Sequence, residues 1–130
     1  MFTVDDVKAA HAKVKSGADF PKYVQDLKQL GLVKYDLFVV DGHAVYFGEN
    51  GYSTASKGSF GPLQIVASGN VEALKYALKI HQNGQTDYLT FCQQSAEAGV
   101  EKWTVNVQDL ICTYYDKTGS EMVVEEIPVP

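Results

Sequence analysis

The dipeptide Asp41-Gly42 constrains the fold of this chain more than any other short segment. It follows a β-rich run, Tyr35–Val40, whose apolar residues on both faces are typical of a covered central strand. Asp-Gly favours a two-residue hairpin turn, because both residues tolerate the left-handed backbone that the turn requires. We expect a hairpin that places Phe38 opposite Val45. Strands joined in this way run antiparallel.

Further strands follow in two blocks of the sequence. Asn50-Gly51 repeats the turn signal and predicts that Tyr46–Glu49 folds back toward Tyr52–Ala55. Residues 116–119 suit a type I turn with a glycine bulge, which joins the last two strands. The strands expected in the second block are Trp103–Val107, Leu110–Tyr115 and Met122–Ile127.

Four helices are predicted from apolar residues at helical spacing, each followed by a glycine that can end the helix. The first begins with a capping box formed by Thr3 and Asp6, and its apolar stripe reaches Val14. Asp19 is expected to cap the second helix and Thr86 to cap the fourth. The helices are bounded by Thr3 and Gly17, Asp19 and Gly31, either Ser68 or Asn70 and Gly84, and Thr86 and Gly99.

The order of elements is helix, helix, strands, followed by helix, helix, strands. This order predicts an α+β fold, in which one antiparallel sheet is built from both strand blocks and four helices pack on it in two pairs. No linker divides the chain, so residues 1–130 are expected to form a single domain. The two halves are alike in outline, but no matching residues between them are evident.

The charge of the chain narrows the classes of function. All eleven basic side chains are lysine, and sixteen acids give a formal net charge of -5. Because arginine dominates base and phosphate recognition, we expect no nucleic-acid partner. The sequence contains no apolar run long enough to span a membrane and no signal peptide, so we expect a cytoplasmic protein with no membrane partner. The two cysteines are expected to be reduced and buried.

Known site templates are not matched. Lys57 follows Ser56 and precedes Gly58, whereas a phosphate-binding P-loop needs glycine before the lysine and serine or threonine after it. None of the three histidines pairs with a cysteine or a carboxylate at a metal-ligand spacing. We therefore expect neither a metal site nor a cofactor.

The densest polar and aromatic segment is residues 81–88, which form the corner between the third and fourth helices. Its polar residues can serve the helix ends alone, or they can bind a ligand at the first amides of the fourth helix. Cys92 is expected on the apolar face of that helix, and either Tyr114 or Tyr115 shares the side of Trp103. The candidate ligand-binding residues are His81, Gln82, Thr86, Asp87, Cys92, Trp103 and Tyr114.

The same segments resemble one family. The matching motifs are His81-Gln82-x-Gly84-Gln85-Thr86-Asp87-Tyr88, Phe91-Cys92, Ala96-x-Ala98-Gly99-Val100-x-Lys102-Trp103, Cys112-Thr113-Tyr114-Tyr115-Asp116 and Ile127-Pro128. They are similar to the YdfO-like family of small uncharacterised enterobacterial and prophage-encoded proteins, sometimes labelled phage envelope proteins. The resemblance covers nearly the whole chain. It implies a compact α+β domain and supplies no activity.

Three classes of function remain open on these grounds. The first is a non-enzymatic binding or interaction module that takes a protein partner or a small neutral ligand in a cleft beside the corner at residues 81–88. The second is a small enzyme that uses His81 or Asp87 as acid or base, with Cys92 or Tyr114 in reach. The third is a homo-oligomer, such as a homodimer, that uses an exposed strand edge or an apolar patch.

Overall fold

The computed structural model describes residues 1–15 and 17–130. Within these residues the helices and strands follow one another in two similar blocks. The elements are α1 (Val4–His11), the 3₁₀ helix η1 (Gly17–Asp19), α2 (Phe20–Leu30), β1 (Leu32–Phe38), β2 (Ala44–Gly48), the 3₁₀ helix η2 (Glu49–Gly51), β3 (Ser53–Ala55), α3 (Val71–Gln82), α4 (Tyr88–Glu97), β4 (Val100–Asn106), β5 (Ile111–Asp116) and β6 (Glu121–Glu126).

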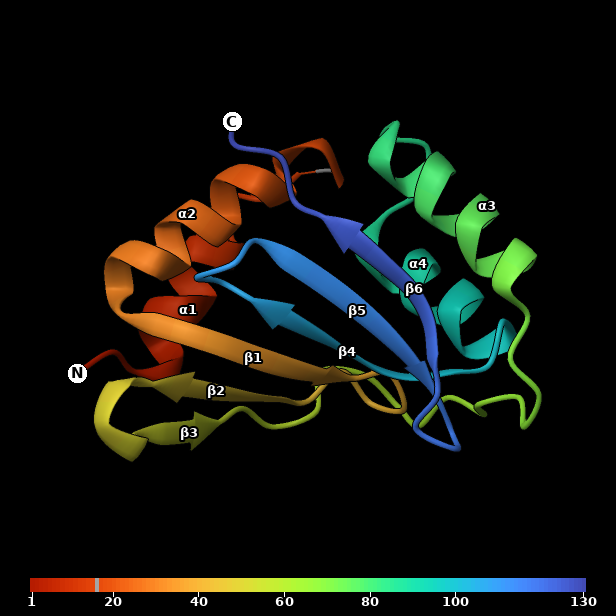
Figure 1. The fold of residues 1–130 in the computed structure, drawn as a ribbon, viewed down its shortest axis with the longest axis horizontal. Coiled ribbons are helices and arrows are strands. Elements are labelled where there is room, and N and C mark those ends of the chain that lie inside the picture. The colour runs from red at the N-terminus through yellow and green to blue at the C-terminus, as the bar shows by residue number, and fades with distance from the viewer. Residues whose placement is uncertain (16) are drawn as a thin grey trace.

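The strands of the described residues form one six-stranded antiparallel sheet in the order β3-β2-β1-β4-β5-β6, which confirms the predicted α+β fold. Figure 1 shows α1 and α2 gathered at one end of the sheet and α3 and α4 at the other. Side chains alternate across the sheet, so Tyr35 and Leu37 are buried while Lys34 is exposed and Asp36 is half-buried. The core therefore lies on one face of the sheet.

The first hairpin differs from the predicted register. Leu37 lies opposite Ala44 and Asp36 opposite Val45, so Phe38 is not the partner of Val45. The N–H of Val39 donates to the carbonyl of Glu101, so Val39 pairs with the neighbouring strand β4 and not with β2. The connection is therefore longer than a two-residue turn.

The central strands also begin earlier than predicted. β1 starts at Leu32 instead of Tyr35, and β4 starts at Val100 instead of Trp103. Each follows directly on a glycine with positive φ, 98° at Gly31 and 86° at Gly99. These left-handed residues end the helix and turn the chain straight into the sheet.

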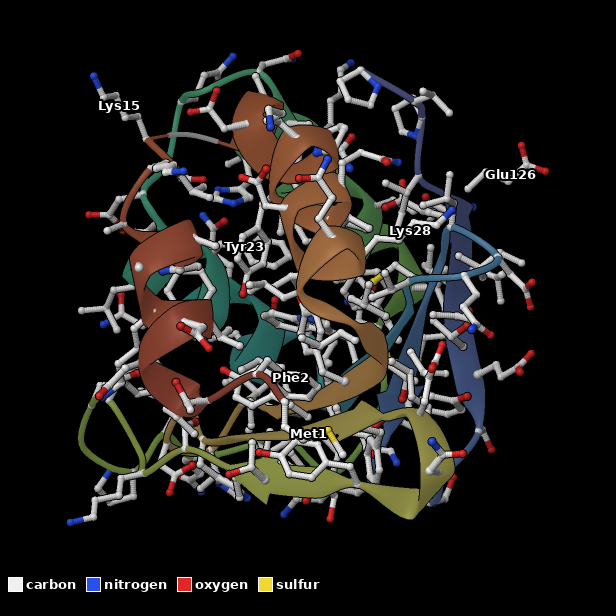
Figure 2. The ribbon with its side chains drawn as sticks, turned by 90° about the vertical axis from the view of Figure 1, so that its left-hand side faces the viewer. Met1, Phe2, Lys15, Tyr23, Lys28 and Glu126 are labelled. Carbon is white, nitrogen blue, oxygen red and sulfur yellow. The ribbon has the colours of Figure 1, made fainter. Side chains whose placement is uncertain are left out.

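The first helix has the predicted start and an earlier end. The Thr3 hydroxyl accepts the N–H of Asp6 at 3.2 Å, and the Asp6 carboxylate accepts the N–H of Thr3 at 2.8 Å, which confirms the capping box. α1 ends at His11, so the predicted stripe to Val14 is too long. The His11 ring packs edge-on against Tyr23 and Tyr88, and Figure 2 shows Tyr23 between α1 and α2 while Lys15 points outward.

The two halves of the chain are related by a pseudo-twofold axis between β1 and β4. Asp36 lies opposite Thr104, and the two side chains share a hydrogen bond of 2.6 Å. A twofold axis through this pair matches residue n of the first half to residue n + 68, since 104 and 36 differ by 68. At this spacing α2, β1, β2 and β3 each begin within one residue of α4, β4, β5 and β6.

Residues match at the same spacing, although no match is evident before the strand register is known. The identical pairs include Asp19 and Asp87, Gly31 and Gly99, Lys34 and Lys102, Val39 and Val107, Asp41 and Asp109, Tyr46 and Tyr114, and Gly51 and Gly119. The first helices match with a spacing one residue shorter, which aligns the N-caps Thr3 and Asn70. The chain is therefore a tandem repeat of two helices and three strands.

Candidate functional site

The corner between α3 and α4 brings together three of the residues selected from the sequence. His81 Nδ1 lies 3.1 Å from the Thr86 carbonyl oxygen and 3.2 Å from the Thr86 hydroxyl. Burial lowers the pKa of His81, and the Thr86 carbonyl and the Asp87 carboxylate oppose that shift. The histidine is therefore held in its neutral form within a hydrogen-bonded turn.

Asp87, not Thr86, caps α4. Its carboxylate accepts the N–H of Thr90 at 2.8 Å, and hydrogen bonds from Thr90 lower the pKa of Asp87. The prediction of Thr86 as the cap is wrong, because the carbonyl and hydroxyl of Thr86 face His81 instead. The Asp87 side chain is exposed and already serves the helix end.

Cys92, Trp103 and Tyr114 lie in the core instead of at the corner. Cys92 is 0% exposed, and burial raises its pKa to about 12. Tyr114 is buried beside Cys112, and desolvation holds its pKa well above the usual range. Tyr114 lies directly opposite Trp103 on the covered face, with 5.7 Å between ring centroids. Solvent does not reach these groups freely.

A ladder of stacked rings connects the corner to this core. The His81 ring lies 4.6 Å from the Phe91 ring and is nearly parallel to it. Phe91 in turn packs on Trp103 at 5.5 Å. His81, Trp103 and Tyr114 thus belong to one packed column, which explains why sequence spacing could not show that they are linked. The column contributes to the packing of the second half of the chain. Its rings do not line either of the hollows that the structure describes.

Gln82 alone of the selected residues lines a hollow described in the structure. The hollow has a volume of about 420 Å³, opens to solvent, and lies between α3 and the edge strand β6. Gln82 Nε2 donates to Glu125 Oε1 at 3.3 Å and joins the two walls. The hollow is lined by Lys75, Leu78, Lys79, Gln82, Asn83, Val123, Val124 and Glu125.

The other residues of this hollow are not among the candidates selected from the sequence. Leu78 is buried, Val124 is 55% exposed, and Glu125 is half-buried, so apolar and polar groups both face the space. Burial raises the pKa of Glu125, while its hydrogen bond with Gln82 opposes the shift. The signal that could have found them is the run of charged and apolar residues in β6, but its place at the edge depends on the strand order.

Two further findings limit the chemistry of the described residues. Among residues 1–15 and 17–130, no three histidine, cysteine or acidic side chains come close enough together to hold a metal ion. In the same part of the chain, no helix has the length and apolar character needed to cross a membrane.

The fold and the hollow define an α+β domain built from two repeats, with an open groove between α3 and the edge strand β6. Residues 8–126 match the model of a family described as "Protein of unknown function (DUF1398)". Because the match covers most of the sequence, the chain belongs to this family. No curated protein matches the chain.

Proposed function

We propose that the chain is a non-enzymatic binding or interaction module that acts at the groove between α3 and β6. One observation carries the proposal: the groups that could react do not meet in a common hollow. His81 is bonded to Thr86, Asp87 caps a helix, and Cys92 and Tyr114 are buried. The α3–β6 hollow, which begins at the corner, is open, and no cysteine or histidine is among the side chains that line it.

The enzyme alternative is less well supported by the same residues. A nucleophilic Cys92 must be a thiolate, and a pKa of about 12 leaves on the order of 10⁻⁵ of the thiol ionised at pH 7. The thiol also sits within α4, four residues after its start at Tyr88, and not at the helix N-terminus that activates cysteines.

The resemblance to YdfO-like proteins extends the proposal to the setting of the module. We infer a bacterial, prophage-type accessory protein that works in the cytoplasm. Both cysteines are free, which suits a reducing compartment. This part of the proposal rests on the sequence motifs and is independent of the groove.

A thermal-shift screen tests the binding proposal. The sets are metabolites, nucleotides, metal ions and short peptides, each tested on the wild type and on Leu78→Trp, which enlarges the buried side chain at the base of the groove and is used only if it still melts cooperatively. A ligand at 100 times its Kd adds about 2.7 kcal/mol to the free energy of unfolding and raises the Tm. We expect hits that Leu78→Trp abolishes and Cys92→Ser retains. A hit that is consumed during incubation, at a rate that His81→Ala lowers, would instead establish an enzyme.

A further inference from the structure

We infer that the groove between α3 and β6 binds an extended peptide segment that carries an acidic side chain, and that this segment adds a seventh strand to the sheet at β6. The inference rests on the proposed binding function and names its partner class. It follows from the free edge of β6, the position of α3, and the charges that line the groove.

The backbone of β6 offers unused hydrogen-bonding groups along the groove. β6 is the terminal strand of the sheet, and β5 pairs with only one of its sides. The N–H of Ile127 donates to Leu110, and pairing directions alternate along an antiparallel strand. Val124 and Glu126 therefore turn their N–H and C=O groups away from β5. A strand that pairs with them completes the ladder, as in other strand-addition complexes.

Helix α3 lies beside β6 and forms the second wall of the groove. Its position limits which kind of strand can pair with β6. A Cβ added to Gly69, just before α3, would lie 3.2 Å from Met122 Cε, and Gln82 at the end of α3 bonds Glu125. The helix therefore runs beside β6 in the same direction, as Figure 1 shows. A lone extended segment would lie about 4.8 Å from β6 in the plane of the sheet, alongside α3. A strand that already belongs to another sheet would bring further strands against α3.

The two lysines on the α3 wall indicate an acidic side chain on the partner, since Glu125 on the β6 wall already accepts a hydrogen bond from Gln82. Lys75 and Lys79 lie four residues apart on α3, so both ammonium groups face the same hollow. Within the described part of the chain, neither lysine forms an ion pair, although Lys22 and Lys102 do. Leu78 and Val123 supply apolar contacts between these charges and the β6 backbone. An extended segment that alternates apolar residues with one central carboxylate satisfies all three features.

The hollow described in the first repeat lies elsewhere, at Phe2, Leu30 and Asn50, and has a volume of about 240 Å³, so the outer edge of the first repeat provides a matched control. Its edge strand β3 has three residues against six in β6, and α1 has eight residues against twelve in α3. The Tyr52 hydroxyl donates to the Phe2 carbonyl at 2.7 Å and ties the start of α1 to β3. Lys8 occupies the position in α1 that Lys75 occupies in α3. Substituting Lys8 in α1 together with Lys13, which follows the end of α1, thus changes the same total charge away from the groove.

The experiment measures fluorescence anisotropy with three labelled seven-residue peptides of alternating valine and threonine. The first carries a central aspartate, the second a central lysine, and the third is the aspartate peptide with alternate amides N-methylated. We expect the aspartate peptide to bind at least tenfold more tightly than the other two. Lys75→Glu with Lys79→Glu should reverse the preference between aspartate and lysine, and Lys8→Glu with Lys13→Glu should leave it unchanged.

A second variant tests strand addition without removing a contact of the folded chain. Val124→Pro deletes an N–H that faces away from β5, so the sheet keeps its own ladder while the partner loses a hydrogen bond. We expect at least a tenfold loss of peptide affinity with little change in Tm. Val123→Pro, whose N–H faces β5, should instead lower the Tm and shows the cost of breaking the ladder.

Other outcomes overturn the inference in distinguishable ways. Equal binding of the aspartate and lysine peptides, or a charge reversal that leaves the preference intact, removes the acidic partner. A dimer in sedimentation velocity that Val124→Pro dissociates identifies the occupant as a second copy. Failure of all three peptides removes the peptide inference, while hits from the thermal-shift screen that Leu78→Trp abolishes would still uphold the binding function.

Discussion

The two halves of the chain build the same ladder of rings from different residues. In each half a histidine near the end of the first helix contacts an aromatic ring on the second helix, then a ring on the first strand and a tyrosine on the next. The first ladder is His11, Tyr23, Tyr35 and Tyr46, and the second is His81, Phe91, Trp103 and Tyr114. The last three rings of each correspond at a spacing of 68 residues.

The difference between the halves lies at their outer edges. The interior columns keep their arrangement although the rings change, which indicates that both serve packing. The outer helix and outer strand, by contrast, are short in the first half and long in the second. Only the second half has the hollow lined by Lys75 and Lys79. Comparing the halves thus separates residues that maintain the fold from residues available for binding.

The largest expected effect is on the interior column. Trp103→Ala removes the largest ring of the second ladder, which is 5% exposed, and should lower the free energy of unfolding by about 3–5 kcal/mol. Tyr35→Ala, at the equivalent position, should lower the free energy of unfolding by a similar amount if the two columns contribute equally to stability. Urea unfolding of both variants checks this. A cost below about 1 kcal/mol for either would show that its column is not a packing element.

The glycines that end α2 and α4 give a second matched pair. Both have positive φ, so alanine at either site is strained by about 1–2 kcal/mol. A Cβ at Gly31 meets nothing within 4 Å, whereas one at Gly99 would lie 2.8 Å from the Ser68 carbonyl oxygen. Gly99→Ala should therefore cost about 1–3 kcal/mol more than Gly31→Ala. Equal midpoints in urea would contradict the close contact of residues 68–69 with Gly99.

The two ladder histidines predict a loss of stability on acidification. Burial lowers the folded-state pKa of His11 and of His81 below the unfolded value, which is about 6.5. Stability is complete above that pH and falls as the pH drops below it, by up to about 1.4 kcal/mol per pH unit for each proton taken up. Urea midpoints between pH 7.5 and 5.5 measure the slope.

Replacing each histidine in turn shows how much of the pH dependence of stability comes from each half of the chain. His11→Gln should flatten the slope more than His81→Gln, because nothing opposes the effect of burial at His11 whereas Thr86 and Asp87 oppose it at His81. An unchanged slope in both variants would assign the pH dependence to other groups.

The smallest effects are expected where the second half has cysteine. Val24 and Ala44 stand at the positions of Cys92 and Cys112 in the first half. Cys92→Val and Cys112→Ala should each cost less than about 1.5 kcal/mol, since the repeat already accepts these side chains. Ellman's reagent should label neither native thiol within minutes at pH 8, because both are buried with a pKa of about 12. Rapid labelling would contradict this burial.

Local signals in the sequence predicted most of the fold. The Thr3 capping box, the glycines that follow the other three helices and the strand blocks depend on neighbours within a few residues, and the structure contains them. The predicted stop at Gly17 is wrong, because α1 ends at His11. The register of the first hairpin depends on Val39 pairing with Glu101 in a distant strand, so local turn chemistry predicted it wrongly. The internal repeat could not be established from the sequence alone, because few residues are identical between the halves and the spacing of 68 that aligns them comes from the β1–β4 register.

The candidate site was predicted in part for the same reason. Residues 81–87 are adjacent in sequence, and their hydrogen bonds are local. Lys79 and Glu125 are 46 positions apart in the sequence, and both line the hollow because β6 lies at the sheet edge. No local pattern specifies which strand is terminal, so the groove could be found only in three dimensions.

The pseudo-twofold axis between β1 and β4 also bears on stoichiometry. Two identical units paired about such an axis would carry two identical outer edges and would be bivalent. Because both units are part of one polypeptide, their edges have become different, and the hollow at β6 has no counterpart at β3 in the described residues. A partner bound at that groove, as we propose, would meet one such site per chain and would not be crosslinked.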